Sequence, residues 1–216
     1  MSRQRRVTEQ LHTLDGLLTR YDEIEAHLSE GEIRGRLWAF ERARDPLAHG
    51  KSPSDWDILD LHRAMFADLF DWAGKTRTED RGPGGNVPVS WPDVRVALRS
   101  LADDLRAWVG ALDGTDPSLA QVAEIVAEAH HRLQWIHPFH DTNGRTGRVL
   151  DHYLLWVTFQ LVGSDFSAAR ALEYFPSSAY EDMYYEGLRE ADLGRPDKLR
   201  AFYLDRLLAS FGDAGE

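Results

Sequence analysis

Residues 137–148 bring a histidine, an aspartate and two arginines into one short segment, His-Pro-Phe-His-Asp-Thr-Asn-Gly-Arg-Thr-Gly-Arg. Pro138 disfavours the helical conformation at the residue before it, so the sequence predicts that a helix ends at His137. This places the imidazole at the mouth of a loop. A neutral histidine in that position can take a proton from an incoming hydroxyl group, which makes His137 a candidate general base.

Arg145 and Arg148 lie three residues apart at the start of the next expected helix, so both guanidinium groups project from one face of its first turn. A helix N-terminus offers free N–H groups and a positive dipole end, and Gly144 lets the backbone approach a bound oxygen closely. Arginine matches phosphate with two parallel hydrogen bonds. These features predict a polyphosphate site, with Asp141 placed to bind a divalent cation that bridges phosphates.

The segment resembles the signature of the Fic family, His-Pro-Phe-x-(Asp/Glu)-(Gly/Ala)-Asn-(Gly/Lys)-Arg-x-x-Arg. The matching residues are His137, Pro138, Phe139, Asp141, Asn143, Gly144, Arg145 and Arg148. The one departure is Thr142, where the family prefers Gly or Ala. The resemblance extends to the segments 38–47, 61–66, 72–78 and 131–136, and covers most of residues 32–205.

The resemblance implies a protein adenylyltransferase, which moves AMP from ATP onto a hydroxyl side chain (Ser, Thr or Tyr) of a target protein. By carry-over, His137 deprotonates the target hydroxyl and Asp141 binds Mg²⁺ between the α- and β-phosphates. Asn143, Gly144 and Arg145 cradle the phosphates in this reading, and Arg148 orients them. Thr142 belongs to the same nucleotide-binding loop and is expected to narrow it.

Two other functions stay open at this stage. The Doc kinases of the superfamily carry Lys where Gly144 stands, so Gly144 favours AMP transfer over phosphorylation. Thr142 keeps alive both a Doc-like kinase or other phosphate-group transferase and a catalytically silent nucleotide-binding module. The resemblance also makes a toxin of a toxin–antitoxin pair plausible, with a separate antitoxin as partner.

Many Fic proteins are held inactive by a helix of pattern (Ser/Thr)-x-x-x-Glu-(Gly/Asn), whose Glu pairs with the last arginine of the signature. The segment Ala26-His-Leu-Ser-Glu30-Gly31 fits this pattern except for its first residue. Glu30 is therefore the candidate self-inhibitor. The alternatives to self-inhibition are inhibition by a separate antitoxin protein and no inhibition at all.

The elements that must position these residues are predicted to be helical. Apolar residues recur at helical spacing over 32–44, 55–73, 93–112, 119–136, 145–162, 178–192 and 196–211, with a shorter helix near 168–174. Ser54 and Ser118 are N-cap candidates. The helix that starts at Arg145 is apolar on most of its surface and is expected to be central and buried. The fold class is therefore all-α, and the resemblance implies a Fic-fold helical bundle.

Two segments are expected to lie outside this bundle. The Gly- and Pro-rich stretch 76–91 lies where the family places its flap, which aligns the target segment by strand-like pairing, and a short β-hairpin is expected around 87–89. A polar helix is expected over 7–27, with a break at 29–31. The expected organisation is an N-terminal helical arm, residues 1–31, followed by a Fic domain, residues 32–216.

Composition limits the remaining function classes. The chain has 216 residues, with 36 acidic against 25 basic side chains and a formal net charge of −11. This balance argues against a nucleic-acid partner or an anionic membrane surface, because binding to phosphate backbones needs clustered positive charge. The chain has no Cys, which excludes disulfides and thiolate chemistry. It has no apolar run of membrane-spanning length and no recognisable signal peptide, so a cytoplasmic, bacterial protein is expected.

Overall fold

The computed structural model describes residues 10–12, 18–20, 24–44, 52–82, 87–161 and 172–211. These residues form the strands β1 (Gln10–His12) and β2 (Leu18–Arg20) and the helices α1 (Glu25–Arg44), α2 (Asp55–Phe66), α3 (Val94–Gly110), α4 (Leu119–Ile136), α5 (Asn143–Leu161), α6 (Ser178–Asp192) and α7 (Asp197–Phe211). A 3-10 turn, η4 (Trp91–Asp93), precedes α3. The predicted all-α class is confirmed, because the described part of the chain is mostly helical and the two three-residue strands form only a short pair.

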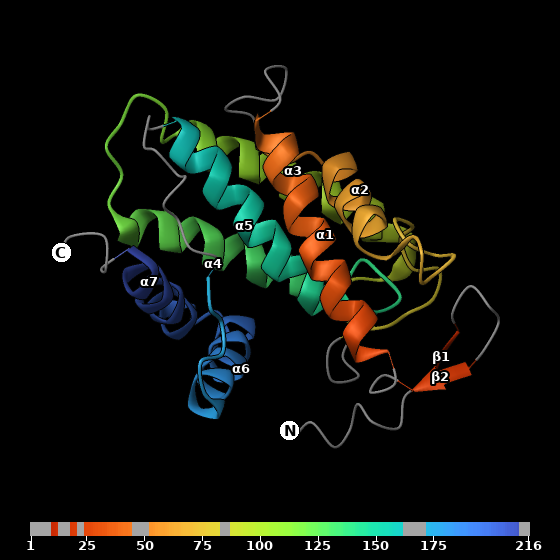
Figure 1. Cartoon of the computed structure of the whole chain (residues 1–216). Helices are drawn as coiled ribbons and strands as arrows, with labels where there is room; N and C mark the ends of the chain where they lie inside the picture. Colours follow the sequence, from red (N-terminus) through yellow and green to blue (C-terminus); the bar gives the residue numbers. More distant parts are fainter. Residues whose placement is uncertain are drawn as a thin grey trace.

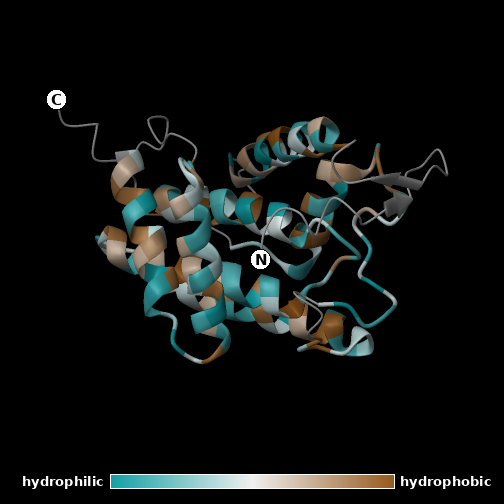
Figure 2. Ribbon diagram, turned by 90° about the horizontal axis from the view of Figure 1, so that it is seen from below, coloured by the Kyte–Doolittle hydropathy of each residue, from teal (hydrophilic) through white to brown (hydrophobic). Residues whose placement is uncertain are grey.

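Helix α5 is the centre of the bundle, as its apolar surface predicted. It packs against α1 and α4 and touches α2, and most of its residues from Val149 to Thr158 are buried. Figure 1 shows α1 lying across α5, while α6 and α7 lie side by side at the other end of the molecule. The helices carry apolar and polar residues on different parts of their surface (Figure 2), which is typical of amphipathic helices around a shared core.

Two apolar clusters hold the described helices together. The larger one joins α1, α2, α3 and α5 with the C-terminal half of α4, and it includes Phe139 of the loop before α5. The smaller one joins the N-terminal half of α4 to α6 and α7. The loop between α4 and α5 is therefore anchored in the larger cluster, which gives residues 137–142 a rigid base.

The predicted helix starts are confirmed at α2 and α4. Ser54 accepts a hydrogen bond from the Asp57 backbone, and the Asp57 side chain accepts one from the Ser54 backbone. Ser118 and Gln121 form the same reciprocal pair before α4. Each of these capping boxes satisfies backbone N–H groups that a helix start leaves without an acceptor.

The predicted break at residues 29–31 is wrong, because α1 runs from Glu25 to Arg44 without interruption. The sequence Ser-Glu-Gly suggests a break, but Gly31 serves close packing. A Cβ there would lie 2.7 Å from the Met65 carbonyl oxygen, and one at Gly35 would lie 2.5 Å from the Met65 side chain. The two glycines thus let α1 approach α2. The division of the chain at residue 31 stays a prediction, although α1 crosses that point.

Three further expectations differ from the structure. The helix over 7–27 is wrong, since β1 and β2 pair antiparallel there and α1 begins only at Glu25. The hairpin near 87–89 is not confirmed: residues 83–86 lie outside the described part, and residues 76–82 and 87–90 contain no strand. The short helix near 168–174 falls mostly on residues outside the described part, and residues 172–174 are not helical.

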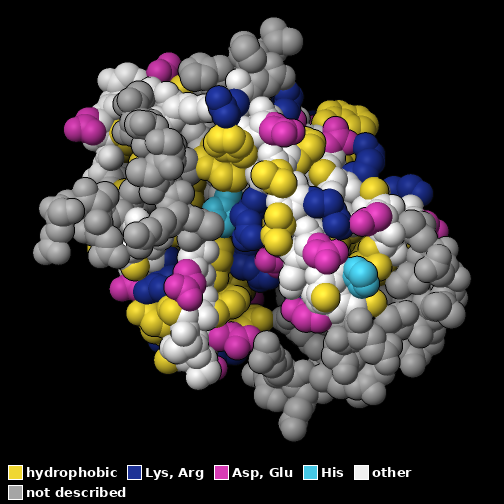
Figure 3. Space-filling model, viewed as in Figure 1, with side chains coloured by type: hydrophobic (Ala, Val, Ile, Leu, Met, Phe, Trp, Pro, Cys, Tyr) yellow, Lys and Arg dark blue, Asp and Glu magenta, His cyan; other side chains and the backbone are white. Residues whose placement is uncertain are grey.

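The described helices are all too short or too polar to cross a membrane. Figure 3 shows acidic and basic side chains interspersed over the face that α1 presents.

Candidate active site

His137 ends helix α4, as Pro138 predicted. Its backbone is left-handed (φ 49°, ψ 59°), and its N–H donates to the Leu133 carbonyl at 3.0 Å. The pKa of His137 is lowered to about 4, chiefly by burial; a hydrogen bond with the Gln134 backbone opposes this change, and the charges of Arg77 and Arg81 add to it. Among the described residues no group pairs with its Nδ1. The imidazole is therefore neutral near pH 7, which a general base requires.

Arg77 fixes the backbone around His137. Its Nε donates to the His137 carbonyl at 2.8 Å, and its backbone N–H donates to the Pro138 carbonyl at 2.8 Å. The same guanidinium also donates to the carbonyls of Glu79 and Val89, on the two sides of the segment 76–91. Its side chain is fully buried. Arg77 thus joins the expected flap to the histidine loop.

Asn143 closes the loop from the other side. Its side-chain oxygen accepts from the Phe139 N–H at 2.9 Å, and its side-chain nitrogen donates to the Phe139 carbonyl at 3.0 Å. Its own carbonyl accepts from Gln134 at 3.1 Å. The Asn143 side chain is buried and braces the loop, so only its backbone N–H, in the first turn of α5, is placed to contact a phosphate.

Thr142 is also buried, and it has a positive φ of 62°. Its hydroxyl lies 3.0 Å from Nε2 of His62 and donates to the Asp141 carbonyl at 2.6 Å, while its N–H donates to the Asp141 carboxylate. Burial lowers the pKa of His62 to about 3, against a smaller opposing effect of a hydrogen bond with the Asp141 backbone. The Thr142 side chain therefore points into the protein, and its effect on a nucleotide would be indirect.

Gly144, Arg145 and Arg148 line the N-terminal turn of α5 as predicted. Among the described residues, a Cβ on Gly144 would meet only the Arg148 guanidinium, at 3.8 Å, so no described side chain crowds this glycine. The two arginines share one carboxylate: Glu32 Oε1 lies 3.0 Å from Nη1 of Arg145 and 2.6 Å from Nη2 of Arg148. A glutamate thus occupies the cationic groups that the sequence assigns to phosphate.

The prediction that Glu30 pairs with the last arginine of the signature is wrong. Its side chain is 62% exposed and lies 3.6 Å from His27, whereas Glu32, two residues later, reaches both arginines. Glu25 adds a second contact to Arg145 at 2.6 Å but is half exposed. Residues two apart in a helix point about 200° away from each other, so Glu30 and Glu32 cannot share a face.

Asp141 fits an ion that arrives with a nucleotide better than a resident metal. Within the described ranges no group of three or more histidines, aspartates or glutamates is arranged to hold a metal. Mg²⁺, however, is commonly held by one or two carboxylates together with substrate phosphates. Asp141 stands two residues before α5, and its carboxylate accepts from the Thr142 N–H, so it suits such a shared ion at the start of that helix.

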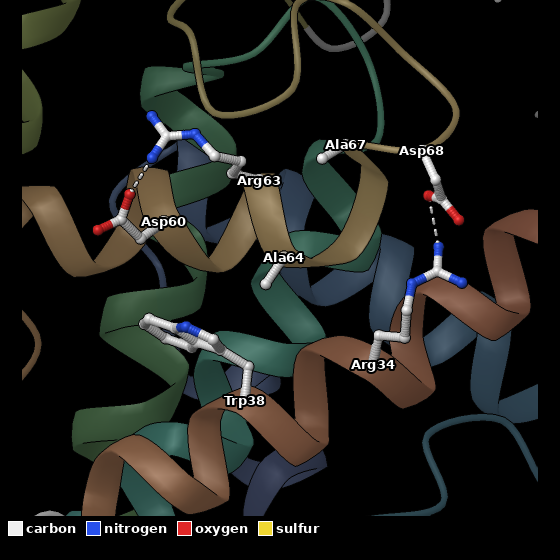
Figure 4. A pocket seen from close by; sticks show the side chains of 7 residues that line it. All are labelled: Arg34, Trp38, Asp60, Arg63, Ala64, Ala67 and Asp68. Carbon is white, nitrogen blue, oxygen red and sulfur yellow. Dashed lines mark hydrogen bonds and ion pairs between the residues drawn. The ribbon is translucent and has the colours of Figure 1, made fainter.

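Three residues that shape the site have no role assigned from the sequence, although two of them, His62 and Arg77, lie in segments of the resemblance. Arg77, His62 and Glu32 lie 60 to 116 residues before the groups they contact. A separate groove between α1 and α2, about 530 Å³, is lined by Arg34, Trp38, Asp60, Arg63, Ala64, Ala67 and Asp68 (Figure 4). Its charges pair with one another, Arg34 with Asp68 and Arg63 with Asp60, and no residue of the 137–148 segment lines it.

The fold and the site define an all-α domain with a neutral histidine at the end of one helix and an arginine-lined turn at the start of the next. Residues 53–155 match the family model described as the Fic/DOC family. This part of the chain is thus similar to the Fic/DOC family, as the signature indicated.

Curated relatives agree with this family. The chain is 31% identical over 100 residues to the protein adenylyltransferase Fic of Nematostella vectensis and 36% identical over 96 residues to a protein adenylyltransferase of Caenorhabditis elegans. These matches cover 46% and 44% of this chain but only 22% and 17% of those proteins. The chain thus corresponds to about a fifth of the length of the curated relatives it matches.

Solved structures show the same fold. The BepC protein of Bartonella tribocorum, crystallised with AMPPNP, has a TM-score of 0.62 at 20% identity, with 92% of each chain covered. The Fic-1 structure from Caenorhabditis elegans has a TM-score of 0.59 at 25% identity and covers 86% of this chain and 51% of that one.

Proposed function

We propose that the protein is a protein adenylyltransferase, which transfers AMP from ATP to a hydroxyl side chain of a target protein. The observation that carries this proposal is a neutral His137 at the end of α4, one short loop before the arginine-bearing first turn of α5. The named activity of the curated relatives and the AMPPNP bound to the related BepC structure support it.

His137 would accept the proton of the target hydroxyl as the hydroxyl oxygen forms its bond to the α-phosphorus. The bond from that phosphorus to the bridging oxygen breaks, and pyrophosphate leaves with its electron pair. Such an in-line exchange needs positioned charges more than covalent chemistry from the protein. The first-turn N–H groups of α5 with Arg145 and Arg148 would bind the phosphates. Asp141 would hold Mg²⁺, whose chemistry there would be to neutralise phosphate charge.

Glu32 would compete with the triphosphate for the arginines. Both guanidinium groups contact one carboxylate oxygen, and a nucleotide phosphate needs the same donors. ATP binding would therefore require Glu32 to move away. We assign to Glu32 the inhibitory role that the sequence suggested for Glu30. A toxin role with a separate antitoxin, and the choice among Ser, Thr and Tyr in the target, stay predictions.

The test uses purified protein, cell lysate and ATP labelled at either the α- or the γ-phosphate. The expected result is label on protein from α-labelled ATP only, absent with a His137→Ala variant of unchanged folding. Label from γ-labelled ATP only would favour a kinase, and no label from either, with Glu32→Gln tested beside the parent protein, would favour a silent nucleotide-binding module.

A further inference from the structure

Thr142 occupies a backbone position that suits it poorly. Its φ of 62° lies in the left-handed region, which glycine enters freely and which a β-branched side chain rarely adopts. The residue is nevertheless buried at the turn between Asp141 and the start of α5. Something in the surrounding structure must hold it there.

The hydrogen bonds at the Thr142 hydroxyl belong to a chain that passes through His62 and ends at the Asp141 carbonyl. The Gly74 N–H donates to Nδ1 of His62 at 2.8 Å, so in the neutral ring the proton is on Nε2. That Nε2–H donates to the Thr142 hydroxyl at 3.0 Å, and the hydroxyl donates to the Asp141 carbonyl at 2.6 Å. The hydroxyl thus receives one bond and gives one, and both contacts fix its place.

His62 is itself held rigidly. Its ring is fully buried and stacks on Phe139, with ring centroids 3.7 Å apart and planes inclined by 12°. Phe66 packs against it edge-on at 5.2 Å. Gly74, the donor to Nδ1, has a φ of 75°, and a Cβ there would lie 2.8 Å from the Arg63 side chain. The α2 helix and the turn after it therefore present Nε2 at a fixed point under the loop.

We propose that His62 is a positioning residue, which holds Thr142 in its left-handed conformation and so aims the Asp141 carboxylate and the first turn of α5 at the nucleotide. This inference rests on the proposed function, because it assigns the nucleotide to that turn. It also explains how the chain tolerates threonine where the Fic signature has Gly or Ala. If Thr142 relaxes, only the fraction of molecules with the correct turn binds ATP, and the apparent Kd rises in proportion.

Two substitutions of His62 separate the two hydrogen bonds of the ring. His62→Gln can keep a donor near the Nε2 position and loses the acceptor for Gly74. His62→Asn can keep the acceptor and loses the donor to Thr142. Both lose the stacking on Phe139. In a calorimetric titration with ATP and Mg²⁺, His62→Asn is expected to bind ATP about tenfold more weakly than His62→Gln. This factor corresponds to the loss of one hydrogen bond, the one donated to Thr142.

The same pair in a Thr142→Gly background tests the mechanism. Glycine needs no support at a positive φ, so the Asn and Gln variants are expected there to differ less than about threefold. A difference that persists in this background, or none in either background, would overturn the proposal, because a packing role of His62 does not depend on Thr142.

Thermal unfolding of each variant shows whether it is folded. If the His62 variants do not fold, Thr142→Val against Thr142→Gly decides, since valine keeps the branched shape and lacks the hydroxyl. Valine is expected to bind ATP about tenfold more weakly than glycine, and equal affinities would refute the inference. Protein that binds ATP with these differences but transfers no AMP would sink the proposed function and leave the positioning role intact.

Discussion

Replacement of Glu32 by glutamine is expected to tighten ATP binding about tenfold. Glu32 contacts Arg145 at 3.0 Å and Arg148 at 2.6 Å, and all three side chains are at most 20% exposed. The Glu32 carboxylate also contributes to raising the pKa of Arg148, against the opposing effect of burial. The nucleotide must displace this contact before its phosphates reach the guanidinium groups.

The magnitude follows from what glutamine keeps. A hydrogen bond to a charged group contributes about 1.5–3 kcal/mol, and glutamine retains the oxygen but not the charge. A loss of about 1.4 kcal/mol in the competing contact corresponds to a tenfold lower Kd for ATP. Without nucleotide, the same loss should lower the free energy of unfolding by about 1.4 kcal/mol, because two largely buried arginines lose a charged partner. Saturating ATP should restore much of that stability.

The assay is a calorimetric titration of ATP with Mg²⁺, together with thermal unfolding with and without ATP. Glu30→Gln is the matched control: it removes the same charge from the same helix, but Glu30 is 62% exposed beside His27, so no change is expected. Glu25→Gln should change the Kd less than about threefold, since Glu25 is 51% exposed. A Glu32→Gln variant that binds ATP no more tightly than the parent protein or the Glu30→Gln control would refute the proposed competition between Glu32 and ATP. Glu32 would then have only a structural role in the site.

Four other predictions concern the loop, the helix packing and the pH dependence of rate and stability. Arg77→Lys keeps the charge but not the forked donors to the carbonyls of His137 and Val89, so steady-state AMP transfer should show kcat lowered about tenfold or more with the Kd for ATP nearly unchanged. Gly31→Ala should lower the free energy of unfolding in urea by about 1–3 kcal/mol, because its Cβ would lie 2.7 Å from the Met65 carbonyl, whereas Gly110→Ala, with open space around its Cβ, should not lower it. The rate of AMP transfer should be flat between pH 6 and 8, since the pKa of His137 is about 4, and a midpoint near 6.5 would contradict this value. Burial lowers the pKa values of His62, His137 and His152, so between pH 6.5 and about 4 only the unfolded chain binds these protons. The free energy of unfolding should therefore be fully present above pH 6.5 and fall by about 1.4 kcal/mol per pH unit for each histidine as the pH drops toward 4. Urea unfolding at pH 7 and at pH 5 checks this.

The sequence was sufficient for the parts of the site that lie close together along the chain. Helix α4 and helix α6 have the predicted bounds, α5 begins two residues before the predicted start, and the loop between α4 and α5 turns where Pro138 requires it. These features depend on capping residues, helical periodicity and proline geometry, all of which act over a few residues.

The errors concern residues whose role depends on a distant element. Gly31 suggests a helix break when read locally, and only its approach to Met65 shows that it is a contact between helices. Glu30 matches the inhibitory pattern better than Glu32, but the face that α1 turns toward α2 and α5 decides which carboxylate reaches Arg148. The apolar residues at helical spacing could not identify that face, because Ile33 and Leu37 are exposed whereas the buried face of α1 carries mostly small residues.

The segment before the family match is therefore part of the site. The match covers residues 53–155, whereas Glu32 lies on α1, outside it. Helix α1 also covers α5, with Trp38 packed edge-on against Tyr153 at 6.0 Å and Phe40 against Trp156 at 5.4 Å. Removal of α1 would free the arginines and expose the apolar face of the central helix at the same time. A truncation would thus confuse loss of inhibition with loss of folding, and only a point substitution at Glu32 separates the two.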